Sequence, residues 1–113
     1  DEADGSALAA ARHWQGRFHL RLGQLTEARD LLVSALSLMT APDLKAAVLA
    51  DLATVETGLS HYPAAESHFA QALRLSPLQP SARVRLLSSM GGLLGRMGRL
   101  AEARRVLEEA VHL

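Results

Sequence analysis

The chain has 113 residues, no cysteine, and twelve cationic side chains balanced by twelve acidic ones. This composition excludes a disulfide framework and thiolate chemistry, and it disfavours nucleic-acid binding, which usually requires a basic stripe with stacking aromatic rings. Leucine (22 residues) and alanine (20 residues) dominate and isoleucine is absent, so an all-α domain without strands is expected.

Apolar residues recur at helical spacing and predict six helices joined by short connections. A polar leader, residues 1–6, precedes the first helix, which we expect to begin with Ser6 as its N-cap and to end before Gly23. The later helices are expected at residues 26–39, 42–58, 63–75, 80–98 and 100–113. Because the connections are short, consecutive helices should pack antiparallel, in three pairs.

A six-residue segment occurs three times, as GQLTEA at residues 23–28, SHYPAA at 60–65 and GRLAEA at 98–103. The copies follow one another at intervals of 37 and 38 residues. In each copy the last alanine lies twelve residues after a small residue of the preceding helix, which is Gly16, Ala53 or Gly91. Such a period is typical of stacked helical hairpins rather than of a single globule.

These offsets resemble those of the tetratricopeptide repeat, a helix–turn–helix unit with a small residue where its two helices cross closely. The turn glycines Gly23 and Gly98 also match the family pattern. The chain departs from it where His19, Glu56 and Leu94 replace the usual tyrosine, and where the period exceeds the usual ~34 residues. The resemblance implies a right-handed α-solenoid of three antiparallel helix pairs. The expected domain is 7–113, with repeats at about 7–40, 42–77 and 80–113.

The resemblance further implies a concave surface, lined by the first helix of each pair, that binds a peptide or protein partner without catalysing a reaction. Helical geometry predicts nine principal residues on this surface: His13, Arg17, Arg21, Asp51, Thr54, Arg85, Ser88, Gly92 and Arg96. Ser89, beside Ser88, is expected on the same face. Arginines at both ends and small residues between them fit an acidic peptide, because guanidinium groups pair with carboxylates. The alternative is that the arginines only solvate an exposed helix face.

Two glycines inside the fifth helix, Gly92 and Gly95, each cost about 1 kcal/mol relative to alanine. Either they give a ligand close access to the helix backbone, or the third repeat is locally loose.

Two apolar stripes lie near the ends of the chain. Trp14, Phe18 and Leu22 are spaced four residues apart, and we expect them to pack as core against the second and third helices. The alternative is an open face that meets a preceding repeat or another chain.

The last helix carries Val111 and Leu113 with no polar capping helix after it. Either the chain is a piece of a longer array, or this helix associates with a second copy.

The five histidines lack the i, i+4 spacing of a helical zinc site, and neither a nucleophile motif nor a phosphate-binding loop is present. We therefore predict no enzyme activity, no metal and no cofactor. No apolar segment approaches the ~18 residues of a membrane-spanning helix, so we expect no membrane contact and favour a cytoplasmic location. The predicted function is a protein-interaction scaffold. The alternative is a regulatory or oligomerisation domain of a larger bacterial regulator or signalling protein.

Overall fold

The structure is a computed structural model that describes the backbone of residues 2–75 and 77–112, with side chains from residue 5 onward. Within these ranges it contains six α-helices and no strand. The helices are α1 (Glu2–Arg21), α2 (Leu25–Leu38), α3 (Pro42–Gly58), α4 (Tyr62–Leu73), α5 (Pro80–Arg96) and α6 (Leu100–Val111).

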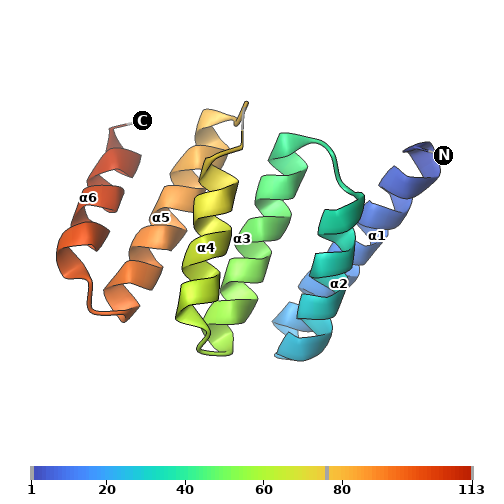
Figure 1. The fold of residues 1–113 in the computed structure, drawn as a ribbon, viewed down its shortest axis with the longest axis horizontal. Helices are drawn as coiled ribbons and strands as arrows, with labels where there is room; N and C mark the ends of the chain where they lie inside the picture. The colour runs from blue at the N-terminus through green and yellow to red at the C-terminus, as the bar shows by residue number, and fades with distance from the viewer. Residues whose placement is uncertain (1, 76, 113) are drawn as a thin grey trace.

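The helices form three antiparallel pairs in a row, with α1 and α6 at opposite ends (Figure 1). The pairs are α1 with α2, α3 with α4, and α5 with α6. Each pair contacts the next mainly through its second helix, so that α2 packs on α3 and α4 packs on α5. The molecule measures 45 × 30 × 19 Å along its principal axes, as expected for a short stack. The predicted all-α helical-repeat solenoid is confirmed.

Among the described residues, two clusters of buried apolar side chains form, one at each junction between pairs. At the first junction, Leu32 of α2 packs with Val48 and Leu52 of α3. At the second junction, Phe69 of α4 packs with Leu93 of α5. These side chains are at most 3% exposed. Each pair therefore buries part of its apolar surface only where the neighbouring pair covers it.

A small residue in the first helix of each pair lies where the second helix crosses it. An added Cβ at Gly16 would lie 2.8 Å from the Leu32 side chain, and one at Gly91 would lie 2.6 Å from the Leu107 side chain. Ala53, the equivalent residue of the second pair, is fully buried. The repeated offset between small residue and alanine therefore reflects these close crossings.

The turn inside each pair places one residue in the left-handed region of the backbone. This residue is Gly23 (φ 77°), Ser60 (φ 63°) or Gly98 (φ 77°). In all three turns the N–H of the next residue donates to the carbonyl five positions earlier, with N···O distances of 2.9, 2.7 and 3.0 Å. This is the hydrogen bond of a Schellman motif, which ends one helix and orients the entry to the next.

The expected start of the first helix at Ser6 is wrong, because α1 begins at Glu2. The first turns of α1 project beyond α2 (Figure 1), and the side chains of Ser6 and Leu8 are exposed. An amphipathic pattern is required only where a helix packs against something, so its absence did not mark the true end of the helix. The other helix ends agree with the expected ones within two residues, apart from Leu113, which lies outside the described residues.

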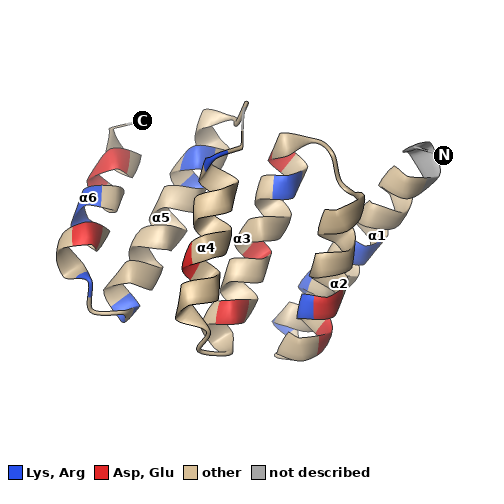
Figure 2. Ribbon diagram, in the orientation of Figure 1, with Lys and Arg blue, Asp and Glu red and all other residues tan. Residues whose placement is uncertain are grey.

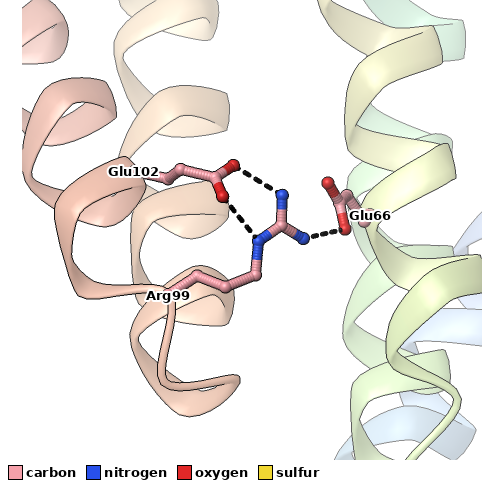
Figure 3. Close-up of polar contacts among 3 residues, drawn as sticks. All are labelled: Glu66, Arg99 and Glu102. Carbon is pink, nitrogen blue, oxygen red and sulfur yellow. Dashed lines mark hydrogen bonds and ion pairs between the residues drawn. The ribbon is translucent and has the colours of Figure 1, made fainter.

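Arg99, in the turn before α6, ties the third pair to the second (Figure 3). Its Nε and Nη2 donate to the carboxylate of Glu102 at 2.9 and 2.5 Å, and its Nη1 donates to Glu66 of α4 at 2.6 Å. These hydrogen bonds raise the pKa of Arg99 and lower the pKa of Glu102. Only the bond to Glu66 crosses from one pair to the next, so it orients the third pair relative to the second.

Candidate functional site

Two adjoining hollows lie along the face formed by the first helices of the pairs. The first has a volume of about 420 Å³ and lies chiefly between α3 and α5, with Arg17 of α1 at its edge. The second has a volume of about 430 Å³ and also reaches Leu25 of α2 and Phe69 of α4. Thr54 and Ser89 line both hollows, so the two form one surface.

The structure brings six of the nine predicted surface residues together around these hollows. Four line the first hollow and three line the second: Arg17, Asp51, Thr54 and Arg85, then Thr54, Gly92 and Arg96. Of the other three, His13 is mostly buried and hydrogen-bonds through Nε2 to Asp51 Oδ2 at 2.8 Å. Arg21 and Ser88 are exposed, and neither lines a hollow.

Ser88 and its neighbour Ser89 were both expected on this face of α5, but only Ser89 lines the hollows. One residue along an α-helix is a rotation of about 100°, which is enough to move a side chain off the face. Sequence reasoning missed Asp43, in the first turn of α3, and Gln79, the N-cap residue of α5, which both line the first hollow. The Gln79 N–H donates to Asp43 Oδ1 at 3.3 Å. Proline beside each of them was the available signal, because it marks two equivalent helix starts.

The charge distribution of this surface differs from the expected one, which placed arginines at both ends. Arg17 lies beside Asp51 (Nε to Oδ2, 3.7 Å), and its guanidinium stacks over the ring of Trp14 at 5.3 Å from the centroid. Asp51 therefore offsets part of the charge of Arg17. Among the side chains that the structure describes, neither Arg85 nor Arg96 has an ion-pair partner. The acidic groups thus lie on α3 and the unpaired cations on α5.

The expected core packing of the Trp14 stripe is wrong. Trp14, Phe18 and Leu22 are 66%, 60% and 56% exposed. Trp14 and Phe18 lie two residues before and after Gly16, where α2 crosses, and two helical residues turn a side chain about 160° away. Periodicity detected the apolar stripe, but it did not show that the stripe faces away from α2.

A buried carboxylate lies away from the hollows. Glu56 is 7% exposed, with Arg29 Nη1 at 3.6 Å and His61 Nδ1 at 3.7 Å, yet its Oε1 has no hydrogen-bond partner. Burial lowers the pKa of His68, and the negative charge of Glu56 partly opposes that shift. In the part of the chain described here, no group of three or more His, Cys, Asp or Glu side chains is placed to hold a metal ion.

Both signs of charge are spread along the row of helices rather than gathered at one end (Figure 2). Over the described ranges, no helix combines the length and apolarity needed to cross a lipid bilayer.

Comparison with known proteins agrees with this architecture. A tetratricopeptide repeat family model matches residues 7–77, which is more than half of the chain, and a second model of the same description matches residues 84–113. No curated protein matches the chain significantly. Repeats of this kind are non-catalytic and generally mediate protein–protein interaction. The two matches together include most of each of the three helix pairs, and the chain belongs to the tetratricopeptide repeat family.

Proposed function

We propose that the chain is a non-catalytic interaction module that binds an extended segment of a partner protein across the two adjoining hollows. The observation that carries this proposal is that two exposed arginines of α5, Arg85 and Arg96, line the same hollows as a row of small side chains on α3. Small residues let a peptide backbone approach closely, and the arginines supply specificity.

The partner segment carries a carboxylate on the side that faces α5. A guanidinium donates two parallel hydrogen bonds to a carboxylate, which makes Arg85 and Arg96 suited to aspartate or glutamate side chains. Asp43 and Asp51 lie on the opposite side of the first hollow and repel a uniformly acidic peptide. The segment we propose therefore places acidic groups toward α5 and neutral or cationic groups toward α3.

The test uses a displayed library of random twelve-residue peptides, selected on the immobilised chain. Fluorescence anisotropy of a labelled selected peptide then measures its Kd at low and high salt. We expect Arg85→Glu and Arg96→Glu each to weaken binding at least about tenfold at low salt, because each places a like charge against the peptide carboxylate. Higher salt should reduce the difference between the variants and the unchanged chain.

Arg74→Glu is the matched control, since Arg74, the C-cap residue of α4, is exposed and lines neither hollow. The same charge change there should leave Kd within about twofold. Selected peptides that bind all three variants as tightly as the unchanged chain would show that the α5 arginines do not contact the partner.

A further inference from the structure

The outward face of α1 is an apolar surface at one end of the stack, distinct from the hollows. Phe18 and Leu22 are 60% and 56% exposed, and Ala11 and Gln15 beside them are also exposed. The structure itself shows what such a face packs against, because the same helical positions occur in α3 and α5.

The repeat interval relates each position of α1 to one in α3 and one in α5. Phe18 corresponds to Val55 and Leu93, and Leu22 corresponds to Leu59 and Met97. Val55 and Leu59 belong to the first junction, where α3 packs on α2. Leu93 and Met97 belong to the second junction, where α5 packs on α4. The exposed face of α1 therefore consists of the helical positions that α3 and α5 bury. In α3 and α5, the second helix of the preceding pair covers these positions.

The other end of the stack exposes the complementary surface. On α6, Leu100 is 69% exposed, Leu107 is 41% exposed and Val111 is 80% exposed. Their counterparts on α4 are Tyr62, Phe69 and Leu73, and all three pack at the second junction. The α6 face thus corresponds to the surface with which α4 covers α5.

We propose that the α6 face of one copy of the chain docks on the α1 face of a second copy, so that the stack continues head to tail. We infer a second copy as the partner because both internal junctions are built in this way. In each, the second helix of one pair packs on the first helix of the next pair through these same helical positions. The chain carries one uncovered face of each kind. Gln15 is the one polar member of the α1 set, so the contact is weaker than the internal junctions, which bury apolar residues at its equivalent positions.

Charges at the proposed junction are compatible. The ion pair between Arg99 and Glu66 crosses the second junction, and the corresponding residues at the new junction are Gln24 of one copy and Arg104 of the other. Gln24 is uncharged and its amide oxygen is a hydrogen-bond acceptor, so at this position no like charges oppose each other. Because the two docking surfaces differ, the contact is heterologous and adds copies stepwise instead of closing at a dimer.

The test is sedimentation velocity on the 113-residue chain at increasing concentrations up to about 1 mM. The average mass should rise with concentration past that of a dimer. Phe18→Asp removes the α1 face and Val111→Asp removes the α6 face, so each variant alone should be monomeric. An equimolar mixture of the two should give a 1:1 dimer and nothing larger, because each variant keeps the face that the other lacks.

Val33→Asp is the control, because Val33 is 53% exposed on α2, outside both faces, and this variant should associate like the unchanged chain. Circular dichroism verifies that each variant is folded, and Leu22→Asp with Leu100→Asp provides a second pair if one of the first is not. Dimerisation of Phe18→Asp alone, dimerisation of Val111→Asp alone, or a monomeric mixture would overturn head-to-tail docking. A chain that stays monomeric at about 1 mM would show that something other than a second copy covers these faces.

Discussion

At the scale of single residues, the turn of the second pair departs from its two counterparts. Ser60 has a φ of 63°, where the other turns have Gly23 and Gly98. A residue with a Cβ pays roughly 1–2 kcal/mol for the left-handed conformation, whereas glycine adopts it freely. The Schellman hydrogen bond is present in all three turns, so the fold holds Ser60 in this conformation at a cost.

We expect Ser60→Gly to raise the free energy of unfolding by about 1 kcal/mol, because it removes this strain. Urea denaturation followed by circular dichroism measures the change. The reverse substitution Gly98→Ser should lower the free energy of unfolding by a similar amount. If Ser60→Gly lowered it instead, the hydroxyl of Ser60 would have to make a stabilising contact that outweighs the strain.

His68 gives the stability of the chain a dependence on pH. Burial lowers its pKa in the folded state below the ordinary value of about 6.5, and its Nδ1 is buried without a hydrogen-bond partner. In the pH range between these two pKa values the unfolded chain binds more protons than the folded chain. The contribution of His68 to the free energy of unfolding is therefore full above the unfolded pKa and decreases as pH falls below it.

The substitution His68→Leu tests this dependence, since Leu31 and Val106 occupy the equivalent positions of α2 and α6. Thermal unfolding between about pH 7.5 and 5.5 should show that the variant loses less stability than the unchanged chain on acidification. His112→Gln, which replaces an exposed histidine, serves as the control and should follow the unchanged chain. Parallel pH profiles for His68→Leu and the unchanged chain would show that other groups cause the dependence.

At the scale of helices, α5 contains two glycines with open space beside them. An added Cβ at Gly92 or Gly95 would meet no atom within 4 Å outside its own helix. Only Gly92 lines a hollow. The two interpretations of these glycines therefore make different predictions. A loose helix would depend on both Gly92 and Gly95, whereas close access of a ligand to the backbone would depend on Gly92 alone.

We expect Gly92→Ala and Gly95→Ala each to raise the free energy of unfolding by up to about 1 kcal/mol, as alanine is the better helix former. Only Gly92→Ala should also weaken binding of the selected peptide, because its methyl group enters the second hollow. Urea denaturation and fluorescence anisotropy measure the two effects. Equal loss of affinity in both variants would favour a loose helix over backbone access.

The helices themselves were largely predictable from the sequence, since Pro42 and Pro80 mark two starts and Gly23 and Gly98 mark two turns. The start of α1 was not, because its first turns pack against little and need no apolar pattern. Helical register alone predicted nine surface residues, and six of them line the hollows. The pairing of Asp51 with His13 and Arg17 did not, because it depends on how α1 and α3 approach each other in space.

At the scale of the whole molecule, each helix pair depends on its neighbour for part of its core. In such an array, stability is approximately the sum of the contributions of the pairs and of the junctions between them. The first and third pairs each form one junction, and the second pair forms two. The repeat period predicted this arrangement, but the Trp14 stripe, which was expected to be covered, lies open at the first end of the stack.

The order of helices in the row also gives the molecule a polarity. The first and second pairs each direct their second helix toward the next pair. The acidic side of the first hollow lies on α3, while the unpaired cations lie on α5. The two sides of the first hollow therefore differ in charge, so a peptide reversed end to end would place its acidic groups against Asp43 and Asp51. If the proposed function holds, a partner segment that uses both sides is accepted in a single orientation, and its sequence is read in one direction.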